Sequence, residues 1–164
     1  MKVKIVNKFN YSTIVNLDKN TRLSPHFRLF EVANNKGDKS IEQMILSPRF
    51  DDFLGQIEEF RVWWNKPMNC NSCFRQVEYN RSIGGAENSL HLLALAFDWG
   101  ESLTYSQRVA VYTKWKEITT KAGRIGGINF YPWGCHIDSY EDLFGHRGFI
   151  IRDGDRIVNY VPKP

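Results

Sequence analysis

Apolar residues recur at helical spacing in two segments of the chain. The first opens at Ser47-Pro48 and ends before Lys66-Pro67. The second covers residues 104–122, and glycines follow it. The apolar stripes that should face the core are Phe50, Phe53, Leu54, Ile57, Phe60 and Trp64 in the first segment, and Val109, Tyr112, Trp115 and Ile118 in the second. The pattern predicts two amphipathic helices.

Short alternating or apolar segments predict strands, and most of them lie late in the chain. Residues 2–6 alternate as a strand does. The late strands are expected at residues 128–131, 135–137, 149–152 and 156–161. Asp153-Gly154 is a hairpin-turn signal between the last two. The predicted fold class is α+β, with helices early and mostly antiparallel strands late.

Four other segments carry weaker signals. Ser40 can cap a short helix that runs through Leu46, and residues 68–75 are compatible with a short strand. Residues 80–88 contain two adjacent glycines and are expected to form a loop. Residues 90–97 are almost wholly apolar, so periodicity does not distinguish a buried strand from a helix there.

Length and charge restrict the class of protein. A chain of 164 residues corresponds to one ordinary domain, here residues 1–164. The net charge of +4 is scattered, so no nucleic-acid-binding surface is expected. Residues 1–10 lack the apolar core of a secretory signal, and no run of 18 apolar residues occurs. We therefore expect a protein made in the cytosol, without membrane insertion, and a monomer.

The three cysteines leave two interpretations open. Cys70 and Cys73 have the spacing of half a zinc ribbon or of a redox pair. A ribbon needs a second cysteine pair, and only Cys135 remains. The odd number also argues against a disulfide framework. Buried, small apolar side chains are the favoured interpretation.

Two histidines have neighbours that suggest a metal site. His91 and Asp98 flank six apolar residues, where an ionised carboxylate needs a partner charge such as a shared divalent metal. Farther on, strand alternation places His136 and Asp138 on one face, and a carboxylate beside a metal-binding histidine orients its ring. The alternatives are a strand with Asp98 facing solvent and a surface histidine–aspartate pair. His26 and His146 have no such neighbours.

Several motifs in order resemble a known family. They are Ser89-x-His91 followed by Asp98, Gly126-Gly127-Ile128-x-Phe130-Tyr131-Pro132, His136-Ile137-Asp138, Asn71 to Arg75, and Leu23 to Phe27. They resemble the zinc D-alanyl-D-alanine carboxypeptidases, which share the Hedgehog/DD-peptidase fold with VanX- and VanY-type enzymes and several phage endolysins. The resemblance covers about residues 23–138 and implies a small antiparallel sheet with flanking helices and a zinc cleft. Residues 145–164 lie outside it and are expected to form an added hairpin that packs on the domain or shapes one wall of the cleft.

The resemblance implies a role for each matching residue. His91, Asp98 and His136 would be the Zn²⁺ ligands. Arg75 would bind a substrate carboxylate or carbonyl, the alternative being a surface salt bridge. Ser89 would contact the substrate, the alternative being a cap for the local loop.

Three departures from the family pattern bear on these roles. Ala94 and Cys73 stand where the family usually has glycine. Trp133 stands where VanX-like relatives carry the acid that acts as general base. Asp138 is therefore either the base or the partner that orients a ligand, and Glu87 and Glu141 are weaker candidates.

The resemblance implies a peptidase that hydrolyses peptide bonds of bacterial peptidoglycan stem peptides, as a D,D-carboxypeptidase or an L,D-endopeptidase. Without a signal sequence, a phage lysis or entry enzyme is expected, acting on the cell wall or periplasm after release or as part of the virion. The alternative is a catalytically impaired, peptidoglycan-binding or virion-associated protein that retains the fold.

Overall fold

A computed structural model describes residues 2–6, 12–16, 18, 20–33, 43–46, 48–141, 148–154 and 156–157. The helices are α1 (Leu29–Val32), α2 (Pro48–Trp64), α3 (Val77–Ser82), the short 3-10 helix η1 (Leu90–Leu93) and α4 (Tyr105–Lys121). The strands are β1 (Lys2–Val6), β2 (Ser12–Asn16), β3 (Gln43–Leu46), β4 (Cys70–Ser72), β5 (Ala96–Trp99), β6 (Ile125–Tyr131), β7 (Gly134–Tyr140), β8 (Ile150–Asp153) and β9 (Arg156–Ile157).

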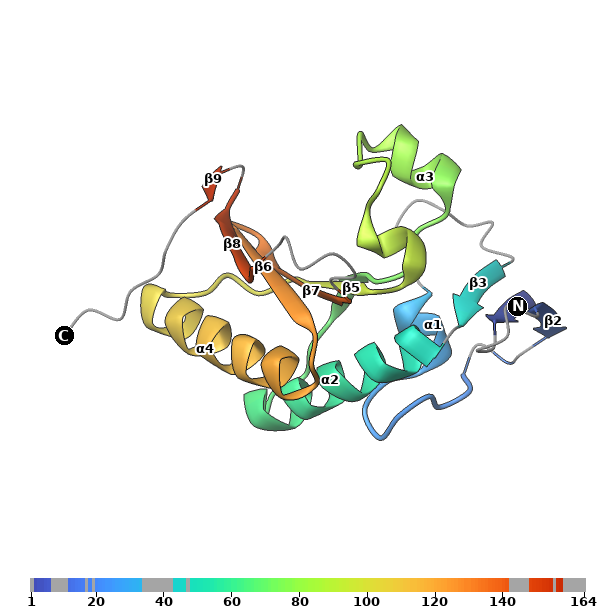
Figure 1. Ribbon diagram of the computed structural model, residues 1–164, viewed down its shortest axis with the longest axis horizontal. Coiled ribbons are helices and arrows are strands. Elements are labelled where there is room, and N and C mark those ends of the chain that lie inside the picture. The colour runs from blue at the N-terminus through green and yellow to red at the C-terminus, as the bar shows by residue number, and fades with distance from the viewer. Residues whose placement is uncertain are drawn as a thin grey trace.

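The strands form two sheets (Figure 1). The larger has six strands in the order β4-β5-β7-β6-β8-β9, and all its neighbours are antiparallel except β6 and β8. The smaller has the order β2-β1-β3. Helices α2 and α4 lie along one side of the larger sheet (Figure 1). The predicted α+β class is confirmed, and so is the mostly antiparallel sheet with flanking helices.

The core lies between these two helices and the larger sheet. The predicted stripe of α2 is buried except for Trp64, which is half-buried. In α4 the buried positions are Val111, Trp115, Ile118 and Thr119, so the stripe is rotated from the predicted one, and Val109 and Tyr112 are only half-buried. The ring of Trp115 meets Phe53 edge-on, with ring centroids 6.2 Å apart. Its indole Nε1–H also donates to the backbone oxygen of Asp138 at 3.0 Å, which ties α4 to β7.

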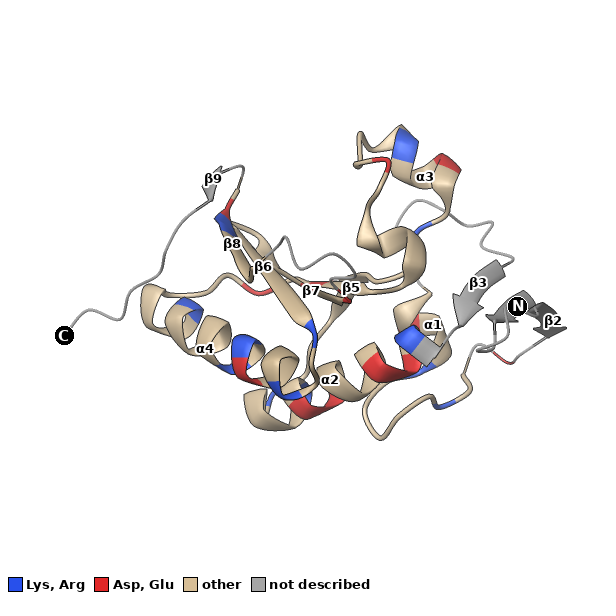
Figure 2. Ribbon diagram, in the orientation of Figure 1, with Lys and Arg blue, Asp and Glu red and all other residues tan. Residues whose placement is uncertain are grey.

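Charged residues of α2 and α4 pair across the helix interface. Acidic side chains are frequent on α2 and basic ones on α4 (Figure 2). Lys121 at the end of α4 lies 3.2 Å from Glu59 of α2, and Arg124 just beyond lies 2.6 Å from Asp52. The positive charge of α4 is therefore partly balanced by α2 and is not gathered into one basic surface. None of the described helices has the length and apolar character needed to cross a bilayer.

Two local predictions are wrong. Residues 43–46 form strand β3, not the end of a helix, because they pair in parallel with β1, and this long-range hydrogen bonding outweighs a weak local helix signal. Ser40 lies outside the described residues. The predicted loop at residues 80–88 begins inside α3, which ends at Ser82, and only the glycine-containing remainder is irregular.

The predicted C-terminal hairpin is confirmed within the described residues. Strands β8 and β9 are antiparallel, and Gly154 in their turn has φ +60°. Strand β8 also pairs in parallel with β6, which joins the hairpin to the edge of the main sheet.

Residues 90–97 contain both of the structures that periodicity left open. Helix η1 is followed by Ala94 in the left-handed region, with φ +55°, and then by β5. A left-handed alanine costs roughly 1–2 kcal/mol, which explains why glycine is usual at this place in the motif. Cys73, by contrast, is not among the positive-φ residues of the described chain, so its backbone does not need glycine.

Ala94→Gly is expected to stabilise the protein. Relief of the left-handed strain exceeds the extra freedom of the unfolded chain, leaving a gain of about 0.5–1 kcal/mol and a melting temperature higher by about 2–4 °C. Differential scanning calorimetry measures this. The matched control is Ala96→Gly in β5, which should lower the melting temperature because Ala96 is buried in regular strand. A lower melting temperature for Ala94→Gly would contradict the strain argument.

Candidate active site

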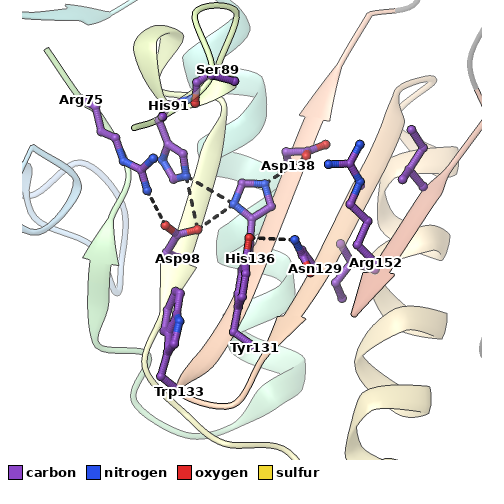
Figure 3. A pocket seen from close by; sticks show the side chains of 15 residues that line it. Arg75, Ser89, His91, Asp98, Asn129, Tyr131, Trp133, His136, Asp138 and Arg152 are labelled. Atoms are coloured by element: carbon purple, nitrogen blue, oxygen red, sulfur yellow. Dashed lines mark hydrogen bonds and ion pairs between the residues drawn. The ribbon is translucent and has the colours of Figure 1, made fainter. Parts of the chain in front are cut away.

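One face of the larger sheet carries a pocket of about 410 Å³. Strand alternation explains which side chains reach it, since Cys135 and Ile137 of β7 are buried in the core while His136 and Asp138 line the pocket. Figure 3 shows its side chains. The lining residues are Arg75, Gly85, Ala86, Ser89, His91, Asp98, Gly127, Ile128, Asn129, Tyr131, Trp133, His136, Asp138, Ile150 and Arg152.

The three residues predicted as metal ligands converge in this pocket. Asp98 and His136 are direct partners in the β5–β7 register, and His91 reaches them from η1. The Nε2 of His91 lies 3.3 Å from Nδ1 of His136 and 3.3 Å from Oδ1 of Asp98. His136 Nδ1 and Asp98 Oδ1 are 2.6 Å apart. These three atoms could hold one metal ion.

Hydrogen bonds on the far side of each ring select the nitrogen that faces the centre. His91 Nδ1 lies 2.8 Å from the carbonyl oxygen of Cys73, an acceptor, so Nδ1 carries the proton and Nε2 is free. His136 Nε2 lies 3.1 Å from Oδ2 of Asp138, so Nε2 keeps a proton if a metal replaces the one on Nδ1. Such outer partners are what metal-binding histidines require.

The geometry fits zinc. Tetrahedral Zn²⁺ with bonds of about 2.0–2.1 Å separates its ligand atoms by roughly 3.3 Å. Both distances from His91 match this value, and the short His136–Asp98 contact would open by roughly 0.7 Å on binding. Two imidazoles and one carboxylate also leave a fourth position open toward the pocket, as in catalytic zinc sites.

Burial and charge act in opposition on these groups. Burial alone would raise the pKa of Asp98, but the two imidazoles hold it well below its usual range. Burial would likewise lower the pKa of His136, yet Asp98 and Asp138 raise it to about 10. Burial lowers the pKa of His91. One buried carboxylate thus faces two rings of unlike protonation, an arrangement in which a metal cation can replace a proton.

Arg75 and Ser89 lie beside this group. The Nη2 of Arg75 donates to Oδ2 of Asp98 at 2.8 Å, and its Nε donates to Ser72 Oγ at 2.8 Å. With 16 % of its side chain exposed, Arg75 forms a largely buried ion pair, not a surface salt bridge. The hydroxyl of Ser89 accepts from the backbone N–H of His91 and caps η1, while the residue also lines the pocket.

Asp138 is held by its surroundings. One oxygen binds His136, and the other is buried without a hydrogen-bond partner in the described part of the chain. Gly127 on β6 makes room for the carboxylate, because a Cβ there would lie 2.6 Å from Oδ1 and 2.7 Å from Oδ2.

Gly127→Ala is therefore expected to displace Asp138 and weaken zinc binding about tenfold, since outer partners of a zinc ligand contribute roughly 10–100-fold. Titration against a zinc-binding dye measures the affinity. Gly55→Ala on α2 is the matched control, because its added Cβ meets nothing within 4 Å. Equal affinities for the two variants would show that Asp138 does not need this space.

Trp133 occupies the position at which VanX-like relatives carry an acid. This residue is 50 % exposed and stacks on Tyr131 with ring centroids 4.8 Å apart. Glu87 does not line the pocket, and Glu141 is paired with Arg49 and Arg124. Among the described lining residues the carboxylates are Asp98 and Asp138, and both bind a ring.

The three cysteine thiols and His26 do not belong to the ligand group. Cys73 and Cys135 are fully buried and Cys70 is half-buried against the core, which confirms the packing interpretation for the first two. Burial raises the pKa of all three thiols. His26 pairs with Glu58. His146 lies outside the described residues.

Sequence reasoning did not single out several features of the site. The Cys73 carbonyl that orients His91 has no signature in residue type. Asn129 and Ile150 were also not predicted, nor was Arg152. For these lining residues the available signal was strand alternation, since Asn129 shares a face with Gly127, and Arg152 with Ile150.

The fold and the site together define a class: an α+β protein in which two histidines and one aspartate that could hold a metal ion converge in a pocket. A comparison with family models agrees, since the model of peptidase M15 matches residues 25–138, more than two-thirds of the chain. The chain belongs to the peptidase M15 family, the zinc D-alanyl-D-alanine carboxypeptidase and VanX-like family that the motifs resemble. No curated protein sequence matches it.

Proposed function

We propose that the chain is a zinc peptidase that hydrolyses peptide bonds in the stem peptides of bacterial peptidoglycan. The observation that carries the proposal is the convergence of His91 Nε2, His136 Nδ1 and Asp98 Oδ1, with the outer nitrogen of each ring bound to an acceptor oxygen. Zinc at such a site supplies a Lewis acid and lowers the pKa of coordinated water to about 7.

The chain's own residues hold the ligands and the substrate. Arg75 keeps Oδ2 of Asp98 occupied, so Oδ1 faces the centre. A substrate carbonyl that enters the pocket would meet the same guanidinium, whose remaining donors suit a carbonyl or carboxylate. Ser89 keeps the start of η1 in place and presents its hydroxyl at the rim.

The family and the pocket support the substrate class. Members of the M15 family act on peptidoglycan, and the pocket is large enough for a few residues of a peptide. We propose a D,D-carboxypeptidase or L,D-endopeptidase specificity, and a phage lysis or entry role in which a monomer acts on the cell wall. The phage role rests on the likeness of Leu23 to Phe27 to a motif often found in phage members.

The direct test uses purified cell walls and purified protein. With zinc, new amino groups and shortened stem peptides should appear in mass spectra of the digested wall, and a chelator should stop their release. Absence of any cleavage product at full zinc occupancy would contradict the proposal.

A second candidate function is supported by the carboxylates of the site. Because Trp133 replaces the usual acid and both described lining carboxylates bind a histidine ring, proton transfer has no free carboxylate there. A catalytically impaired protein that binds peptidoglycan would have this arrangement. It would sediment with cell walls but release no amino groups, so the same experiment distinguishes the two functions.

A further inference from the structure

Arg152 belongs to the C-terminal hairpin, beyond the residues that match the family, yet it lines the pocket. The pocket's other arginine, Arg75, is bound to Asp98. The ion pairs that arginines form with described residues do not include Arg152, and its side chain is exposed. Among the described residues, the hairpin therefore contributes an unpaired positive charge to the site.

The strand register places this charge relative to the metal group. Asp98 is the partner of His136, His136 of Asn129, and Asn129 of Arg152. All four line the pocket, so they form one row across four neighbouring strands. Adjacent strands are about 4.8 Å apart, so the backbone of Arg152 lies roughly 10 Å from that of His136. Figure 3 shows Arg152 on the side of His136 opposite Arg75, with its guanidinium near Asp138.

The immediate neighbours of Arg152 leave its charge available. Asn129, directly opposite it, donates to the hydroxyl of Tyr131 at 2.7 Å. Ile150, on the same face of β8, is apolar. Asp138 is the acid on this side; its Oδ2 binds His136, and its buried Oδ1 has no hydrogen-bond partner among the described residues, so it does not bind Arg152. An anionic group brought by the substrate is thus the natural partner for the guanidinium, which binds a carboxylate through two parallel hydrogen bonds.

We propose that Arg152 is a substrate-binding residue that recognises a free carboxylate of the peptide. The hairpin thereby adds a specificity determinant that the family-matched part of the chain lacks. This inference rests on the proposed peptidase function, but it can fail separately.

The test compares two variants of the full chain, loaded with zinc. The probes are the peptide L-Ala-γ-D-Glu-L-Lys-D-Ala-D-Ala and analogues in which one carboxylate at a time is a carboxamide. For the unsubstituted protein, KM should rise at least about tenfold for one analogue, the range expected for a charge-assisted hydrogen bond. Arg152→Gln should raise KM for the parent peptide by the same factor and no longer distinguish that analogue. Arg61→Gln, on α2 behind the sheet, makes the same charge change away from the pocket and should behave as the parent protein.

Every other outcome contradicts either the role of Arg152 or the proposed peptidase function. Unchanged discrimination by Arg152→Gln would refute the proposal while leaving the peptidase function intact. An equal loss of kcat for all probes would also refute it and show that Arg152 acts through Asp138. If no probe is cleaved, the proposed peptidase function fails. Calorimetric Kd values for the same peptides then test the role of Arg152: a preference for one carboxylate that Arg152→Gln removes supports the assignment, and any other pattern rejects it.

Discussion

Replacing His91 with alanine is expected to abolish zinc retention. His91 Nε2 is 3.3 Å from both other candidate ligand atoms, and its Nδ1 is fixed by the Cys73 carbonyl. Among the described residues, no other His, Cys, Asp or Glu completes a group of three with Asp98 and His136. Loss of a ligand should weaken binding by more than the roughly 10–100-fold attributed to outer partners. Metal analysis after gel filtration, and the shift of melting temperature on adding zinc, measure the effect. Zinc should raise the melting temperature of the unsubstituted protein but not that of the variant.

Two further variants distinguish zinc loss caused by a missing ligand from zinc loss caused by misfolding. Asp98→Asn keeps the shape of the side chain and should lose zinc as well, although Arg75 then faces a neutral partner. His26→Ala removes an imidazole that pairs with Glu58 away from the pocket, and it should retain a full zinc complement. A full complement in folded His91→Ala would show that the ion is held elsewhere.

The three candidate ligands were predictable from the motifs, and their convergence was predictable only through the family resemblance. Asp98 and His136 become partners only when β5 pairs with β7, and a chain-local pattern contains no information on that register. The alternation along β7 did predict correctly that His136 and Asp138 share a face opposite Cys135 and Ile137.

The failures of prediction follow from long-range contacts. Strand β3 forms through its pairing with β1, in which the partners Ile5 and Leu46 are 41 positions apart in the sequence. The four residues of β3 have no decisive local preference. The rotated stripe of α4 has a similar origin. Trp115 and Val111 face the sheet, so Val109 and Tyr112 lie at the edge of the buried face. Helix α2, with six apolar positions in one stripe, was predictable because its own pattern determines its buried side.

The sequence left two roles open for Asp138, general base or the partner that orients a ligand, and the geometry favours the second. Oδ2 of Asp138 is the hydrogen-bond partner of His136, and Oδ1 is buried beside Gly127. The backbone oxygen of Asp138 accepts a hydrogen bond from Trp115. An atom without solvent access is poorly placed to take a proton from the pocket. The environment suits a residue that fixes the ring of His136, and this distinction has a measurable consequence.

Asp138→Asn is expected to weaken zinc binding by about 10–100-fold. The amide can turn its NH₂ toward His136 Nε2, which favours the tautomer with the proton on Nδ1, the nitrogen that the metal needs. Zinc affinity from competition with a chelating dye measures the loss, and peptide hydrolysis followed against zinc concentration shows its consequence. Because the chain's other site residues are untouched, excess zinc should restore most of the turnover. Unchanged affinity combined with a turnover lower by at least about 100-fold at full occupancy would instead identify Asp138 as the proton acceptor, the alternative role that its place after His136 allows.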